Sequence, residues 1–111
     1  MIYHISSKLK WNNALEIGNY KVPPLFTKGF IHACTQAQLK GMLDKYYKVR
    51  KNILILHIDE TKLIADIEFV SSSTDDVAFP HILGVINLDS VVEISILQDT
   101  PIKLKNKNLL P

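Results

Sequence analysis

Histidine is the residue type whose placement in this sequence points most directly to chemistry. His4, His32 and His81 each lie in a short strand-like segment beside small or turn-forming residues. Because side chains alternate across a strand, His4 and His32 point away from their apolar neighbours and can face one cleft. An imidazole titrates near neutral pH, so such a cleft suits acid–base chemistry or a polar ligand. His57 differs, because it lies inside the apolar run NILILHID and is typical of a core or sheet-face histidine.

Four interpretations of the three histidines stay open on the residues alone. Each histidine can simply be hydrogen-bonded within the fold, with no ligand. Three histidines can form a zinc site, although the sequence has no H-x-x-x-H pair. Cys34 can act as a nucleophile, because it precedes Thr35 at the predicted start of a helix, where a thiol pKa is lowered. Finally, the histidines and the hydroxyls of Ser6 and Thr35 can hold a ligand that carries ribose or phosphate oxygens.

Short strands and two early helices are expected to position these residues. Ser6 and Ser7 can cap a first helix that ends at Gly18. Thr35 and Gln38 have the spacing of a capping box, and apolar residues at helical spacing follow them. Residues 20–26 are predicted to be extended or turning, because Pro23-Pro24 disfavours a helix. Strands are predicted over residues 2–5, 29–33, 52–59, 63–70, 79–83 and 91–97. This order predicts an α+β fold with a small split sheet, mixed or antiparallel.

Composition indicates one globular domain. The chain has 111 residues, of which 47% are hydrophobic and 22% charged. We expect a single domain over residues 1–100 and a basic, flexible tail over residues 101–111, with a polar loop at residues 71–76.

No apolar run reaches the roughly 18–20 residues that cross a membrane. The single cysteine excludes an internal disulfide and favours a cytoplasmic protein.

Charge argues against nucleic acid as the partner. The net charge is +2, but three lysines lie in the last nine residues, and without them the body carries −1. A nucleic-acid-binding face normally carries a basic stripe with interleaved aromatic residues. The sequence therefore favours a small-molecule partner and does not indicate an oligomeric state.

Several segments resemble a bacterial family catalogued as domain of unknown function 952. They are YHIS at residues 3–6, GFIHACT at 29–35, ID at 58–59 and FPHILG at 79–84. The family motifs read roughly Y-H-I-[ST], G-F-I-H-C-S-T, L-x-I-D and F-P-H-I-Y-G-P. The resemblance covers about residues 2–97, and its GFIH and FPHI segments are the most specific.

The resemblance implies a fold like that of the ADP-ribosyltransferases, with a split sheet around a NAD cleft. The order of motifs is also similar to that of the NAD-using RNA 2′-phosphotransferases. By that likeness His4 and Ser6 would contact the ribose and amide side of the nucleotide. His32 would then lie on the second strand of the cleft, and His81 on the third segment.

Some positions depart from the family pattern. Ala33-Cys34 stands where the family has cysteine and serine, and Leu83 and Val85 replace a tyrosine and a proline. The family often has an aromatic residue followed by glutamate before the polar loop. Here Glu68 is the nearest acid. Binding of a nucleotide is therefore better supported than its turnover.

We therefore predict an α+β domain with ADP-ribosyltransferase-like architecture that binds NAD or an ADP-ribosyl compound and needs no metal. His32 and His81 are the predicted catalytic residues if the nucleotide is turned over, while Phe30 and Phe79 pack in the core. The alternatives are a non-catalytic nucleotide- or protein-binding module and a zinc-dependent hydrolase. The predicted binding residues are His4, Ser6, His32, Thr35, His81 and Gly84.

Overall fold

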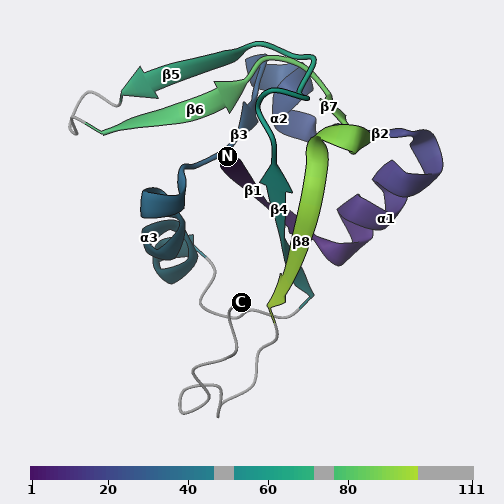
Figure 1. Cartoon of the computed structure of the whole chain (residues 1–111), viewed down its shortest axis with the longest axis horizontal. Helices are drawn as coiled ribbons and strands as arrows, with labels where there is room; N and C mark the ends of the chain where they lie inside the picture. The colour runs from purple at the N-terminus through teal and green to yellow at the C-terminus, as the bar shows by residue number, and fades with distance from the viewer. Residues whose placement is uncertain (47–51, 72–76, 98–111) are drawn as a thin grey trace.

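Eight strands, three α-helices and one 3₁₀ turn follow one another in the computed structural model, which describes residues 1–46, 52–71 and 77–97 (Figure 1). The elements are β1 (Ile2–Ser7), α1 (Lys8–Ile17), β2 (Asn19–Tyr20), α2 (Pro23–Lys28), β3 (Ile31–His32), α3 (Gln36–Tyr46), β4 (Ile53–Ile58), β5 (Ile67–Ser71), β6 (Ala78–Ile82), β7 (Ile86–Asn87), the 3₁₀ turn (Leu88–Ser90) and β8 (Val91–Leu97). Most of the predicted loop at residues 71–76 and the whole predicted tail at 101–111 lie outside the described residues. In the described part, no helix combines the length and the apolar character needed to cross a bilayer.

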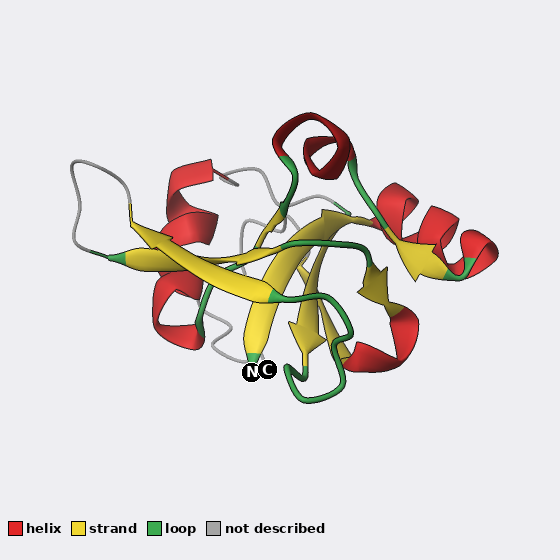
Figure 2. Ribbon diagram, turned by 90° about the horizontal axis from the view of Figure 1, so that it is seen from above, coloured by secondary structure: helices red, strands yellow, loops and turns green. Residues whose placement is uncertain are grey.

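The strands form three small sheets, and every described pairing is antiparallel. Their orders are β1–β4–β8, β2–β7 and β3–β6–β5. The β5–β6 hairpin lies across one end of the β1–β4–β8 sheet and extends over the side where α3 lies (Figures 1 and 2). The predicted α+β class is confirmed, and the split sheet is antiparallel rather than mixed.

The segment after β3 joins the two three-stranded sheets. Ala33 donates its N–H to the carbonyl of Pro80 at 3.1 Å, whereas Cys34 and Tyr3 exchange two backbone hydrogen bonds of 2.8 Å. Proline has no N–H to return the bond to Ala33, so regular pairing of β3 with β6 ends at His32. The predicted strand over residues 29–33 is therefore only two residues long. Its histidine lies where the β6 and β1 pairings meet.

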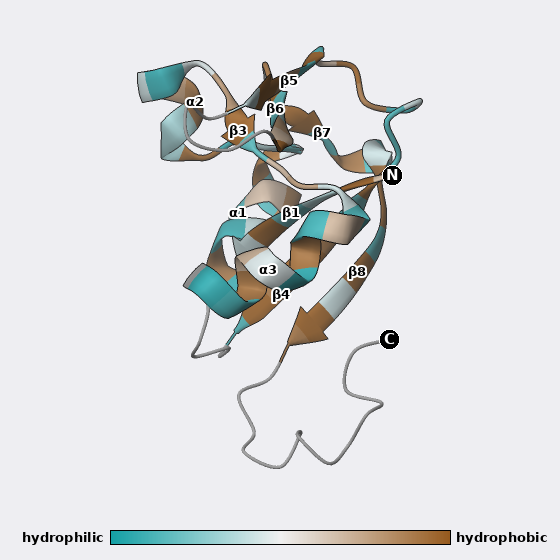
Figure 3. Cartoon of the chain, turned by 90° about the vertical axis from the view of Figure 1, so that its left-hand side faces the viewer, coloured by the Kyte–Doolittle hydropathy of each residue, from teal (hydrophilic) through white to brown (hydrophobic). Residues whose placement is uncertain are grey.

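The central strand β4, which lies within the predicted strand at residues 52–59, is buried on both faces. Ile53 and Ile55 face α3, where they join a small apolar cluster with Leu43. Leu54 and Leu56 face the opposite way, into the main core beneath α1 and the other two sheets. Figure 3 shows the brown, apolar strand behind α3, which covers that face. Alternation along one strand thus divides the core into two clusters.

Local sequence signals set the starts of α1 and α3, but a third helix, α2, was not predicted. Ser7 caps α1 by accepting the Lys10 N–H at 3.1 Å, and Gln38 Oε1 accepts the N–H of Thr35 at 2.9 Å in the predicted capping box. The prediction that residues 20–26 hold no helix is wrong. Pro23 and Pro24 occupy the first positions of α2, where an N–H has no helical partner and a φ near −65° is already correct.

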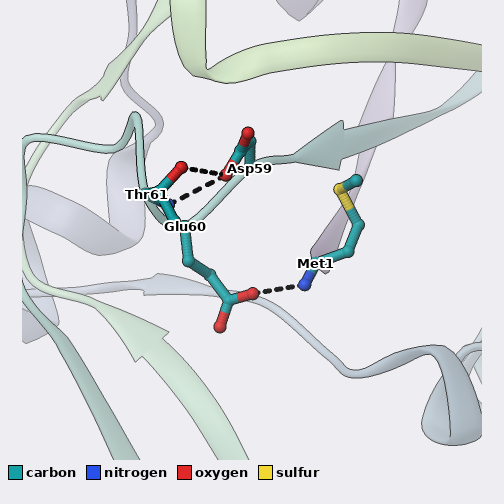
Figure 4. Close-up of polar contacts among 4 residues, drawn as sticks. All are labelled: Met1, Asp59, Glu60 and Thr61. Atoms are coloured by element: carbon teal, nitrogen blue, oxygen red, sulfur yellow. Dashed lines mark hydrogen bonds and ion pairs between the residues drawn. The ribbon is translucent and has the colours of Figure 1, made fainter.

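The turn after β4 is fixed by the aspartate of the predicted ID motif. The Asp59 carboxylate accepts hydrogen bonds from the Thr61 N–H at 2.9 Å and hydroxyl at 2.6 Å (Figure 4). These bonds lower the pKa of Asp59. The amino group of Met1 pairs with the Glu60 carboxylate beside them. The start of β1 is thereby tied to the end of its partner strand β4.

Two glycines, one at the end of a helix and one inside a helix, provide a matched test of backbone conformation. Gly29 ends α2 at a φ of 85°, a left-handed conformation, whereas Gly41 lies inside α3. An added Cβ meets nothing within 4 Å at either position. We expect Gly29→Ala to lower the free energy of unfolding by about 1 kcal/mol through backbone strain. Gly41→Ala should raise it by about 0.5–1 kcal/mol through helix propensity. Urea titration of both variants measures the difference, and changes of the same sign would contradict this explanation.

Candidate functional site

Three polar side chains lie side by side on the β3–β6–β5 sheet. His32 on β3 pairs with His81 on β6, and His81 pairs with Glu68 on β5. Residues directly opposite each other in antiparallel strands share one face of the sheet. We call these three residues the imidazole row. The two predicted catalytic histidines therefore lie together, and Glu68, the acid nearest to the position of the family's glutamate, lies beside them.

The two imidazoles are brought close by the hydrogen-bond pattern of the strands. Because Ala33 and Pro80 form a hydrogen-bonded position, the adjacent pair His32 and His81 is a non-hydrogen-bonded pair, whose side chains lie closer together. Their ring centroids are 5.4 Å apart, with an interplanar angle of 85°. His32 is exposed and His81 is half-buried. Both rings are therefore accessible from solvent at one spot.

Phe30 packs directly against this pair. Its ring stacks on His81 with centroids 3.8 Å apart and planes 1° apart, and it meets the edge of His32 at 4.8 Å. The sequence predicted that Phe30 packs in the core, but the structure places its half-buried ring on the imidazoles. The phenyl ring holds His81 in place and leaves His32 more freedom to turn.

Both imidazoles of the row are biased toward the neutral form. Partial burial lowers the pKa of His32, and the charges of His81 and Lys28 lower it further. Burial also lowers the pKa of His81, although Glu68 opposes that shift. A neutral imidazole has one nitrogen that donates a hydrogen bond and one that accepts. At pH 7 the two imidazoles of the row therefore offer both hydrogen-bond donors and acceptors, and Glu68 adds a carboxylate.

His4 lies behind the row in a buried network. Its Nδ1 donates to the carbonyl oxygen of His32 at 2.5 Å, and its Nε2 lies 2.9 Å from the hydroxyl of Tyr20. That hydroxyl also lies 3.0 Å from Ser6 Oγ. Burial lowers the pKa of His4 to about 4, so the ring is neutral at pH 7. Both ring nitrogens already have protein partners, and the one at Nδ1 fixes the backbone of His32.

A small hollow lies between β1, the segment after β3 and α3. Its volume is about 50 Å³, and His4 and His32 both line it. Pockets that enclose drug-sized ligands measure roughly 300–1,000 Å³, so this hollow has room for a few water molecules or one small group. Its remaining lining residues are Tyr3, Ile5, Ala33, Cys34 and Met42.

The other predicted binding residues have local structural partners. Ser6 belongs to the His4 network, and Thr35 starts α3. Gly84 follows β6, where an added Cβ would come within 3.1 Å of the Ala65 Cβ. The missing side chain of Gly84 therefore makes room for another part of the same chain. Direct contact of Ser6, Thr35 or Gly84 with a ligand stays a prediction.

The structure also bears on the two alternative chemistries, a cysteine nucleophile and a three-histidine zinc site. Burial raises the pKa of the Cys34 thiol to about 11, so the predicted lowering by the helix start is wrong and the thiol stays protonated at pH 7. Within residues 1–46, 52–71 and 77–97, no three histidine, cysteine, aspartate or glutamate side chains are grouped to hold a metal.

Sequence reasoning missed two residues of the site. Phe30 lies two residues before His32, so strand alternation alone could have placed both on one face. Tyr20 gave no such signal, because its contacts with His4 and Ser6 join residues 16 and 14 positions apart. Only the three-dimensional pairing reveals that contact.

Comparison with solved structures supports the fold. The chain is similar to the crystal structure of protein CC0527 from Caulobacter crescentus, with a TM-score of 0.77 and 23% identity over 87% of this chain and 85% of that one. The solution structure of CC0527 gives a TM-score of 0.75 and 22% identity, over 95% and 94% of the two chains. A search of curated proteins finds no significant match. The sequence also matches the family described as protein of unknown function DUF952 over residues 5–94, which is most of the chain, and this chain therefore belongs to the DUF952 family.

Proposed function

We propose that this protein binds a nucleotide carrying an ADP-ribosyl group, with NAD and ADP-ribose the first ligands to test. The observation that carries the proposal is the imidazole row, in which His32, His81 and Glu68 lie at one register of three adjacent strands. Two further features support it. The segments at residues 3–6, 29–35 and 58–59 follow an order similar to that of the motifs of the NAD-using RNA 2′-phosphotransferases. Phe30 also offers an aromatic surface beside the row.

The size of the hollow decides how such a ligand would lie. A volume of about 50 Å³ is too small to enclose a dinucleotide, so most of the ligand would lie across the exposed face of the β3–β6–β5 sheet. Lys28 ends α2 and is close enough to His32 to influence its pKa. A cation at this place would favour the phosphates of a nucleotide by electrostatic attraction.

Each residue of the row has a defined task in this proposal. His32 exchanges hydrogen bonds with a ribose hydroxyl, and His81 holds or moves a proton between the ligand and Glu68. If the bound nucleotide is NAD and is turned over, water would attack C1′ of the ribose as its bond to nicotinamide breaks, which gives ADP-ribose and free nicotinamide. A nearby carboxylate would favour the positive charge that develops at the ribose. His4 and Ser6 act behind the row, because the His4 hydrogen bond to the His32 carbonyl fixes the strand that carries His32.

The second candidate is a non-catalytic module that binds the same nucleotide without turning it over. The small hollow favours this candidate, because catalysts usually exclude water from the reacting bond. Release of nicotinamide from NAD separates the two candidates. Release that disappears in Glu68→Gln supports catalysis, whereas binding of NAD without release supports the module.

Calorimetric titration of metal-free protein with ADP-ribose tests the binding itself. We expect His32→Gln and His81→Gln each to weaken binding by about tenfold or more, the loss of one good hydrogen bond to a polar ligand. His57→Gln is the matched control, because His57 bonds Ser95 on the other sheet and should leave affinity unchanged. Absence of binding at millimolar NAD and ADP-ribose would overturn the proposal.

A further inference from the structure

The spacing of His32 and His81 matches that of two imidazoles on one metal ion. With a metal–nitrogen bond of about 2.1 Å and tetrahedral geometry, two ligating rings have centroids about 5.3 Å apart. The observed centroid distance is 5.4 Å. The two residues belong to a non-hydrogen-bonded antiparallel pair, so their backbones fix this spacing from adjacent strands.

Local packing gives the pair one fixed and one adjustable ligand. Phe30 stacks on His81 at 3.8 Å and holds that ring. His32 is exposed, and rotation about the soft χ2 torsion can turn one of its nitrogens toward the point shared with His81. This rotation moves the side chain alone and requires no change in the strands.

Glu68 lies opposite His81 on the adjacent strand β5, which places a carboxylate beside the two imidazoles. A carboxylate beside the pair also offsets part of the positive charge of a bound cation.

We propose that His32 and His81 chelate a divalent late first-row transition-metal ion, with water in the remaining coordination positions. Imidazole ligands suit Zn²⁺, Ni²⁺ and Cu²⁺ and disfavour Mg²⁺ and Ca²⁺. A pair is sufficient for an open site of this kind, which agrees with the finding that the described residues hold no group of three ligands. The inference does not depend on nucleotide binding, because it uses the two rings alone.

Calorimetric titration with Zn²⁺ tests the chelate, using protein without a histidine tag, freed of metal and kept free of nucleotide. One ion is expected to bind at pH 7.5. His32→Ala and His81→Ala should each weaken binding at least tenfold, because even the loss of a residue that only supports a metal ligand costs about 10–100-fold. His57→Ala is the control and should bind Zn²⁺ like the original protein. Mg²⁺ should give no heat of binding.

A second measurement covers the case in which a variant folds poorly. Zn²⁺ should raise the thermal midpoint of the original protein and of His57→Gln, since an ion that binds only the folded state stabilises it. The midpoints of His32→Gln and His81→Gln should not rise. The proposal is overturned if either single variant binds Zn²⁺ within twofold of the original protein, or if His57 variants lose binding equally.

Discussion

Replacement of His4 by leucine is expected to lower the free energy of unfolding by about 2–4 kcal/mol. Leucine fills much of the same space but cannot donate to the His32 carbonyl or bond the Tyr20 hydroxyl, which are held at 2.5 and 2.9 Å. A buried polar group left without a partner costs about 1–3 kcal/mol, which applies here to the His32 carbonyl. The Tyr20 hydroxyl keeps its contact with Ser6, so its lost hydrogen bond adds only about 1 kcal/mol. Urea denaturation of the original protein and the variant measures the difference.

The matched control is the same substitution at an exposed histidine. His32→Leu should change the free energy of unfolding by less than about 0.5 kcal/mol, because the ring of His32 is exposed. A double-mutant cycle then tests the network itself. Tyr20→Phe should cost less in the His4→Leu background than alone, by about 1 kcal/mol. Additive effects, or equal losses at His4 and His32, would show that the network does not stabilise the fold.

The second large effect is a loss of stability in mild acid. Burial lowers the pKa of His4 from its ordinary value of 6.5 to about 4 in the folded state. Protonation therefore favours the unfolded chain, so the stability contributed by neutral His4 is complete above pH 6.5 and is lost as the pH falls toward 4. A shift of this size corresponds to about 3 kcal/mol.

Thermal or urea unfolding between pH 8 and pH 4 measures this loss. His32 and His81 shift in the same direction, so the original protein contains their contributions as well. The variant His4→Leu keeps those two residues, and its stability should fall by about 3 kcal/mol less over the same interval. Parallel pH profiles for the original protein and the variant would contradict the assignment of the acid sensitivity to His4.

The sequence was informative wherever a local pattern determines structure. The continuous apolar run at residues 52–59 predicted β4, and the spacing of Thr35 and Gln38 predicted the start of α3. Family motifs pointed to His32 and His81, and the structure brings these two together. The antiparallel alternative was also among those predicted, because the predicted strands outnumber the helices and both predicted helices lie early.

The rest required information that no local pattern contains. The two prolines of α2 lie at the helix start, which depends on where the preceding strand ends rather than on the prolines themselves. The short length of β3 follows from the missing N–H of Pro80 on another strand. Tyr20 encloses His4, and packing of β2 and α1 against the central sheet brings Tyr20 to this position.

The most direct test of the imidazole row is an NMR titration of metal-free protein with NAD and with ADP-ribose, in which the ring signals of the four histidines are followed. We predict saturable shifts at His32 and His81 while His57, which bonds Ser95 at 2.8 Å, stays unchanged. Ring signals that do not move at millimolar ligand, or that move only at His57, would contradict the assignment of the row as a nucleotide site.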